Sequence, residues 1–235
     1  MHTIKWGRAN PAPFFFSGLR MPQYDHDKGA AREVLCRLLA ACYYEPGSEF
    51  AEEKVFNSML GAAKRIDPDL AVRAARLSEA FSAEALDALL LDYTRLFLGP
   101  TETIAQPYGS VWLSGEKLLM QDSTMAVLEL YGEGGFEIGE DFRDLPDHIA
   151  AELEFLYLLI YREDQAHRVG EADALTSAAD LRKRFLSEHL GAWIEPFTAA
   201  VSAGAQTAFY RELAELTNRF VRMEAGGGEA HRHVG

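Results

Sequence analysis

The chain has 235 residues, of which 48% are hydrophobic and 25% are charged, and its formal net charge is −13. This composition is typical of a globular protein that can bury a substantial core. The negative charge argues against general affinity for nucleic acid, because phosphate backbones attract Lys and Arg. It fits a basic partner, and it also fits a role in solubility alone.

The two ends of the chain are expected to lie outside the core. Phe14-Phe15-Phe16 is too short to span a membrane and lacks the longer apolar region of a signal peptide, so we expect no stable membrane insertion. Residues 1–30 are expected to form a poorly ordered N-terminal extension, with 1–20 either a loose arm or an upstream extension of the gene. The glycines after position 225 indicate a flexible tail over 224–235.

Apolar residues at helical spacing predict helices through most of the chain. Ser82 is the expected cap of one helix, and Gly99-Pro100 is its expected end. No stretch alternates strictly, so strands are predicted to be absent or trivial. The predicted fold class is all-α, a helical domain of about nine to eleven helices, either single or in two lobes. The expected helices cover 27–44, 49–63, 69–80, 83–98, 114–130, 144–163, 172–190, 193–203 and 206–223.

Turn residues in the middle of the chain predict a connection between two helical halves. Residues 31–100 are expected to form the N-terminal half and 114–223 the C-terminal half. Pro107 and its neighbours predict that 101–113 is an extended linker or hinge without a regular helix.

The two cysteines are expected to be buried and unpaired. Cys36 and Cys42 are six residues apart, which does not place them on one face of a helix. The sequence therefore does not predict a disulfide framework.

The segment from Asp144 to Tyr157 reads as the start of a helix. Asp144 is a candidate N-cap, Pro146 fits the first turn, and Asp147 adds negative charge at the positive end of the helix dipole. None of these explains His148, because a cation is unfavourable there, and we expect a neutral imidazole. His148 is either a surface residue of a capped turn or part of a polar cluster that binds a partner.

The motifs that mark common catalytic sites are missing. The sequence contains no GxxxxGK[ST], GxGxxG, GxSxG or HExxH motif, so we expect no catalytic residues, no metal site and no cofactor. An alternative is a small helical metal-dependent hydrolase that uses Asp147, His148 and Glu152, although their spacing is not a recognised ligand pattern. A chain of this size without a catalytic constellation is more typical of a binding protein.

Two motifs resemble those of the TorD/DmsD family. Pro146-Asp147-His148-Ile149, followed by Glu152-Leu153 and Phe155-Leu156, is similar to the family's Pro-Asp-His signature. Tyr93 to Pro100 and Pro107 to Trp112 resemble its Leu-Phe-x-Gly-Pro segment and its Pro-Tyr-x-Ser-x-Tyr/Trp linker. Gln106 and Gly109 depart from the linker pattern, where the family usually has Glu, and Pro107 stands where it has paired prolines. The resemblance covers residues 33–220.

The resemblance implies a cytoplasmic chaperone for a molybdenum-containing oxidoreductase. Such proteins bind the twin-arginine leader of the enzyme subunit and hold its apo form until the cofactor is inserted, which delays export. The family includes monomers and homodimers that exchange halves across the linker, and this choice and the client enzyme stay open here. Some members bind guanine nucleotide, but nothing in this sequence indicates a phosphate site.

The resemblance also implies a set of peptide-binding residues. Carboxylates such as Asp147 and Glu152 are expected to pair the leader's arginines, and His148 to bond the linker or the peptide backbone. The apolar groove is expected to include Leu96 and Phe97, although plain core packing is the alternative for the aromatic residues and is favoured for Phe97. The full set is Asp147, His148, Glu152, Pro107, Tyr108, Ser110, Trp112, Leu96, Phe97 and Gly99.

Overall fold

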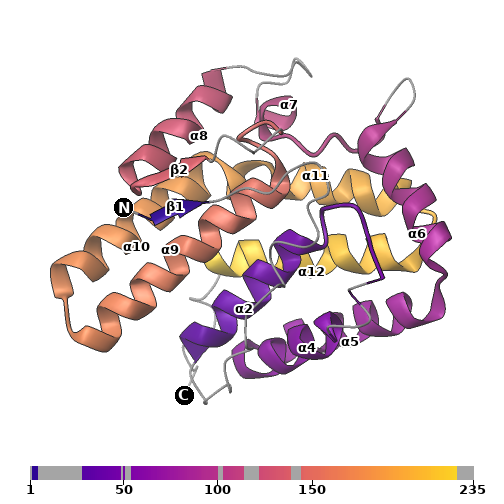
Figure 1. The fold of residues 1–235 in the computed structure, drawn as a ribbon, viewed down its shortest axis with the longest axis horizontal. Helices are drawn as coiled ribbons and strands as arrows, with labels where there is room; N and C mark the ends of the chain where they lie inside the picture. The colour runs from indigo at the N-terminus through magenta and orange to yellow at the C-terminus, as the bar shows by residue number, and fades with distance from the viewer. Residues whose placement is uncertain are drawn as a thin grey trace, which may run out of the picture.

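The computed structural model describes residues 2–4, 28–48, 50, 54–99, 103–113, 122–138 and 144–226. In these ranges the chain forms ten α-helices and one π-helix, which confirms the all-α prediction (Figure 1). The strands there are β1 (His2–Ile4) and β2 (Phe136–Ile138), a parallel pair of three residues each. Most of the predicted N-terminal extension and of the tail lies outside the described residues.

The helices follow one another with short connections. Their bounds are α2 Lys28–Ala41, α4 Val55–Ile66, α5 Pro68–Ala83, α6 Leu86–Tyr93, the π-helix η1 Thr94–Leu98, α7 Gly109–Leu113, α8 Asp122–Glu133, α9 Ile149–Val169, α10 Ala172–Glu188, α11 Leu190–Gly204 and α12 Ala208–Glu224. None of the described helices is both long and apolar enough to cross a bilayer.

Helix α9 is the centre of the packing. It lies between α10 and α2, while α12 packs against both α5 and α11 (Figure 1). The pairs α2–α9 and α5–α12 each join one predicted half of the chain to the other, so the halves share a single core. Ile149, Leu153, Leu156 and Ile160 are fully buried, as their spacing predicted. Phe155 on another face of α9 is fully buried as well, because neighbours cover the helix on several sides.

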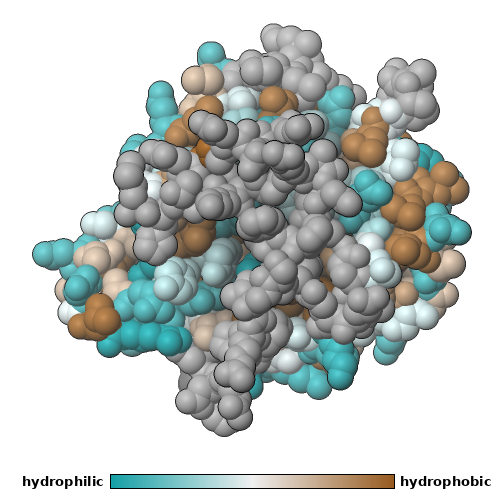
Figure 2. Space-filling model, viewed as in Figure 1, coloured by the Kyte–Doolittle hydropathy of each residue, from teal (hydrophilic) through white to brown (hydrophobic). Residues whose placement is uncertain are grey.

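Other buried side chains confirm the expected core. Leu89 and Tyr93 of α6 are 1% and 8% exposed. Cys36 and Cys42 are buried free thiols, as predicted. At the α6 end of the molecule hydrophobic residues reach the surface, where Leu91 and Leu98 are 66% and 58% exposed (Figure 2).

The predicted cap at Ser82 is wrong. Helix α5 continues to Ala83, and the Ser82 hydroxyl donates to the backbone carbonyl of Ser78 at 2.9 Å inside that helix. Glu84 interrupts the helix with extended backbone, and its carboxylate accepts the backbone N–H of Ala208 at 2.6 Å, at the start of α12. A tertiary contact therefore sets this boundary, and α6 begins only at Leu86.

Two other predicted boundaries also differ. The helix expected over 49–63 is broken at Lys54, which adopts a left-handed conformation with φ 53°, and α4 runs on from Val55; residues 49 and 51–53 lie outside the described residues. The linker expected to lack a regular helix contains α7, because its last five residues turn into a helix that packs on α11. The expected start of the next helix at 114 lies outside the described residues, and α8 is described from Asp122 onward.

Replacing Leu153 with Ala should lower the free energy of unfolding by about 2–5 kcal/mol, because its side chain is fully buried and its loss leaves a cavity. Urea denaturation followed by far-ultraviolet circular dichroism measures the change. Met125→Ala is the control, since Met125 of α8 is 61% exposed, and it should change the value by less than about 0.5 kcal/mol. If both variants lost the same free energy of unfolding, the central position of α9 in the core would be contradicted.

Candidate functional site

The two motifs that are distant in sequence meet in space. The backbone N–H of Gly109 donates to the carbonyl of Asp147 at 2.8 Å, and the N–H of Ile149 donates to the carbonyl of Pro107 at 2.8 Å. These two bonds pair Tyr108 with His148 as an isolated antiparallel bridge. The linker is therefore fixed along the start of α9.

The Asp147 side chain binds the backbone of the linker. Its Oδ2 accepts the backbone N–H of Ser110 at 2.8 Å, in the first turn of α7. The residue is only 1% exposed, and its Oδ1 is buried without a hydrogen-bond partner in the described part of the chain. The expectation that Asp147 meets a basic group of a peptide does not match this position, because the linker covers the carboxylate.

His148, rather than Asp144, is the N-cap of α9. Its Nδ1 accepts the backbone N–H of Ala150 at 3.1 Å, so in the neutral ring the hydrogen is on Nε2. Burial lowers the pKa of His148, although Asp144 and Asp147 oppose the shift. The imidazole is thus neutral at physiological pH, as its place at a helix N-terminus predicted.

Asp144 lies one turn before α9 and does not cap this helix as predicted. Its Oδ1 accepts the hydroxyl of Tyr108 and the backbone N–H of Leu145, both at 2.8 Å. Its Oδ2 lies 3.9 Å from Nε2 of His148, and the side chain is 40% exposed. Asp144 is therefore the accessible carboxylate of this segment. The sequence analysis had expected Asp147 to be the accessible one.

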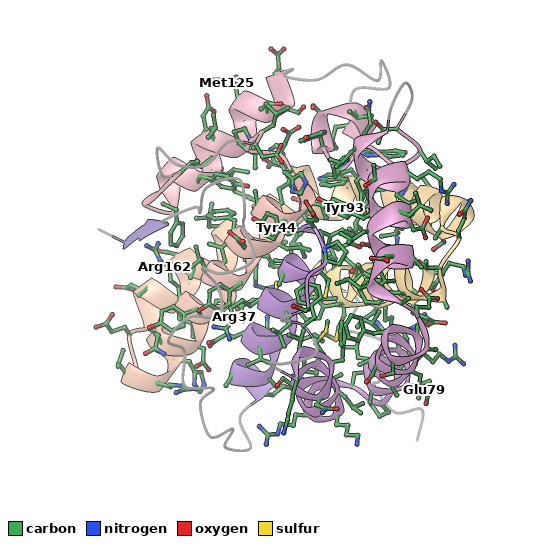
Figure 3. All side chains as sticks on the ribbon, turned by 45° about the vertical axis from the view of Figure 1, so that its right-hand side comes forward. Arg37, Tyr44, Glu79, Tyr93, Met125 and Arg162 are labelled. Atoms are coloured by element: carbon green, nitrogen blue, oxygen red, sulfur yellow. The ribbon has the colours of Figure 1, made fainter. Side chains whose placement is uncertain are left out.

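Aromatic rings enclose the imidazole of His148. The ring of Tyr44 stacks on it with a centroid distance of 6.2 Å, and that of Tyr108 meets it edge-on at 5.5 Å. Tyr44 follows α2, and Tyr93 of α6 lies near it in the middle of the molecule (Figure 3). We call Tyr44, Tyr93, Tyr108 and Asp144 the tyrosine–aspartate cluster.

Glu152 is fully buried behind the linker. Its Oε2 accepts the indole N–H of Trp193 at 3.1 Å. Burial raises the pKa of Glu152 well above its usual range, and the bond from Trp193 only partly offsets that effect. Gly109 packs against this pair so closely that a Cβ there would lie 2.9 Å from the Trp193 nitrogen and 3.0 Å from Oε1 of Glu152. Sequence patterns could not identify Trp193 as a partner of Glu152, because α11 and α9 are far apart in the chain.

The remaining predicted residues divide between core and linker. Leu96 is fully buried and Phe97 is 5% exposed, with Tyr43, Tyr93, Phe197 and Tyr210 around the Phe97 ring, so core packing describes both. Trp112 is half-buried and donates its indole N–H to the carbonyl of Gln106 at 2.8 Å. Gly99 ends η1 with φ 52°, a conformation that favours glycine.

Two exposed apolar residues near the linker were missed by the sequence analysis. Leu98 ends η1, and Ile104 in the linker is 40% exposed and packs beside Gly204 of α11. They lie where an apolar peptide segment can reach them, unlike Leu96 and Phe97.

The three side chains of the hydrolase alternative each take part in a hydrogen bond with a different residue. Asp147 bonds Ser110, His148 bonds Ala150 and Glu152 bonds Trp193. Among the described residues no group of three His, Cys, Asp or Glu side chains is placed to hold a metal ion. This geometry does not support the hydrolase alternative.

Comparison with known proteins gives consistent matches. Chaperone protein TorD of Shewanella pealeana is 26% identical over 185 residues, which cover 76% of this chain and 76% of that protein. The Tat proofreading chaperone DmsD of Salmonella typhimurium is 27% identical over 187 residues, 78% of this chain and 83% of that protein. The perchlorate reductase assembly chaperone protein of Dechloromonas aromatica is 29% identical over 209 residues, 83% and 88% of the two chains.

A solved structure has the same fold. It is described as a redox enzyme maturation protein from Archaeoglobus fulgidus, and it superposes with a TM-score of 0.50 at 20% identity, covering 81% of this chain and 93% of that one. Its identity is too low to carry more than the fold.

The fold is that of the solved maturation protein, and the two joined motifs are those that resemble the TorD/DmsD family. A family model described as the nitrate reductase delta subunit matches residues 63–199, and the chain belongs to this family, with TorD and DmsD among its relatives. The resemblance drawn from the two motifs is thereby confirmed.

Gly109→Ala should lower the free energy of unfolding by about 1–3 kcal/mol, because the new methyl group would overpack the Glu152–Trp193 pair. Thermal and urea denaturation measure it. Gly61→Ala in α4 is the matched control, since no atom lies within 4 Å of a Cβ there, and it should gain about 0.5–1 kcal/mol from helix propensity. If Gly109→Ala left the free energy of unfolding unchanged, the linker would have to shift without cost to admit the methyl group.

His148→Asn should make the protein less sensitive to acid. The pKa of His148 is lowered in the folded chain, so below about pH 6.5 only the unfolded state binds this proton. The stabilising contribution is therefore present above that pH and is lost as the pH falls, by up to about 1.4 kcal/mol per unit. Asn keeps the cap acceptor for Ala150 without titrating.

Urea denaturation from about pH 7 to about pH 5 measures this difference. His189 also has its pKa lowered by burial, but it is present in both proteins and cancels. Parallel pH profiles for the two proteins would mean that His148 is protonated as readily in the folded chain as in the unfolded one.

Proposed function

We propose that this chain is a cytoplasmic chaperone that binds the twin-arginine leader of a molybdenum-cofactor oxidoreductase and holds its apo form before export or assembly. The observation that carries the proposal is the pairing of the linker with the Pro-Asp-His segment, which joins both family motifs into one site. Family membership supports it, as do relatives described as a Tat proofreading chaperone and a perchlorate reductase assembly chaperone.

The site residues take two kinds of role in this proposal. Tyr108 and Trp112 are half-buried and present side chains at the peptide-binding surface, and His148 lies beneath it with its side chain 6% exposed. The others shape that surface from buried positions: Asp147 and Glu152 fix the linker, Leu96 and Phe97 support η1, and Pro107, Ser110 and Gly99 set the path of the backbone. Leu98 and Ile104 add exposed apolar area for the leader's hydrophobic core.

The charge of the chain favours such a ligand. A net charge of −13 attracts a basic leader at long range and raises the rate of encounter. This contribution is screened by salt, so binding should weaken as ionic strength rises.

Wild-type protein should bind at least one twin-arginine leader from the molybdoenzymes of the same genome, each supplied as a synthetic peptide. Binding to the folded state should stabilise the protein by about 2.7 kcal/mol at a peptide concentration of 100 Kd, which appears as a higher melting temperature. The same peptide with both arginines replaced by Gln is the control and should shift the melting temperature less.

Two results would argue against this function. Absence of binding by every leader, measured by isothermal titration calorimetry, would contradict leader recognition. A stoichiometric transition metal in the purified protein, found by elemental analysis together with hydrolytic activity, would favour the hydrolase instead.

A further inference from the structure

An accessible carboxylate oxygen at the site has no hydrogen-bond partner. Oδ1 of Asp144 accepts from Tyr108 and Leu145, whereas Oδ2 has no hydrogen bond within the described ranges. The side chain is 40% exposed, so this oxygen is available to a ligand. Asp144 therefore offers an acceptor that the fold has oriented but does not use.

A buried donor points at the same place. The side chain of His148 is only 6% exposed, and its Nε2 carries the hydrogen because Nδ1 already accepts from Ala150. Nε2 lies 3.9 Å from Oδ2 of Asp144, which is too long for a hydrogen bond. The described chain supplies no other acceptor for it, so a donor and an acceptor stand side by side without being paired to each other.

The surroundings of Asp144 combine aromatic rings with a second acid. Tyr108 bonds Asp144 directly, and Tyr44 stacks on His148. The carboxylates of Asp144 and the exposed Glu45 both lie close enough to Tyr93 to reinforce the rise in its pKa that burial causes. Glu45 and Asp144 thus act on the same aromatic ring from two elements of the fold.

Within the described ranges, this negative charge is not paired with Lys or Arg. In the part of the chain that the structure describes, neither Asp144 nor Glu45 forms an ion pair with Lys or Arg. Among the described residues His148 lies 3.9 Å from Asp144, and burial lowers the pKa of its imidazole, which favours the neutral form. Two carboxylates beside tyrosine rings, which no described Lys or Arg pairs with, form a site suited to an external cation.

We propose that the tyrosine–aspartate cluster, together with Glu45, binds the guanidinium group of one leader arginine, while Nε2–H of His148 donates to a carbonyl of the peptide backbone. This inference rests on the proposed function and names the partner group and the residues that recognise it. A guanidinium fits better than an ammonium, because it is planar, stacks on aromatic rings and donates two parallel bonds to a carboxylate. Buried Asp147 then has no direct contact with the arginine.

The test is calorimetric titration of the tightest-binding leader peptide against Asp144→Asn. Asn keeps an oxygen for the Tyr108 hydroxyl and the Leu145 N–H, so the fold should be retained, and melting temperature checks this. Loss of the charge should weaken binding by about 10- to 150-fold. Glu45→Gln should weaken it less, because Glu45 reaches the ligand through a more exposed, screened position.

Asp173→Asn is the matched control, since Asp173 is an exposed acid on α10 outside the cluster and the variant has the same net charge as Asp144→Asn. It should bind the leader as the wild type does. Replacing each leader arginine in turn by citrulline, which is neutral and nearly isosteric, identifies the arginine that binds. For that arginine the effects of citrulline and Asp144→Asn should be non-additive.

Each outcome separates this inference from the proposed function. If the wild type binds the leader, and Asp144→Asn and Glu45→Gln both bind as tightly as Asp173→Asn, the cluster is not the arginine site although leader recognition stands. The same holds if Asp144→Asn and every citrulline substitution are additive. If no leader binds the wild type, leader recognition fails and this inference fails with it.

Discussion

The pairing of the linker with the first residues of α9 is the constraint on which the site depends. Two backbone bonds and the Asp147 carboxylate hold residues 107–110 in place. Because the pairing uses backbone groups, it fixes the positions of Tyr108 and His148 whatever their side chains do. In this position the Tyr108 hydroxyl donates to Asp144, and Nδ1 of His148 caps α9. The pairing also lies where α7 begins at Gly109. The path of the linker, the position of α7 and the N-cap of α9 therefore depend on the same contacts.

Charge is distributed in two layers around this arrangement. Glu152 and Glu154 lie in the core, where burial raises the pKa of each well above its usual range, and each accepts one bond, from Trp193 and from Tyr44. An ionised carboxylate is costly at such a depth, so these groups favour the protonated state and serve as neutral anchors. The side chain of Asp144, in contrast, is 40% exposed. Under the proposed function, the exposed acids Asp144 and Glu45 face the leader, while burial favours the neutral form of Glu152 and Glu154 beneath them.

Sequence patterns identified most helices, because the spacing of apolar residues indicates which face of a helix is buried. The residues that form the helix therefore carry this signal themselves. Boundaries set by distant contacts were missed. Ser82 has the chemistry of a cap, but Glu84 is drawn to the start of α12 and moves the break. Asp144 also has the chemistry of a cap, but Tyr108 engages it, and His148 takes the capping position because the linker fixes its backbone. The Trp193–Glu152 bond had no local signal at all. The two motifs do meet in space, but which of their acids is exposed depends on which one the linker covers.

The same contacts narrow the place where the chain can cross between subunits in an exchanged dimer. Such an exchange keeps every native contact and changes only the hinge. Residues 107–110 are bonded to the start of α9, so they move with the C-terminal half. Ala105, in contrast, donates its backbone N–H to Leu96 of η1 at 2.9 Å and belongs with the N-terminal half. With both sets of bonds kept, the predicted hinge over 101–113 reduces to the backbone around Gln106, between a residue held by η1 and a proline held by α9.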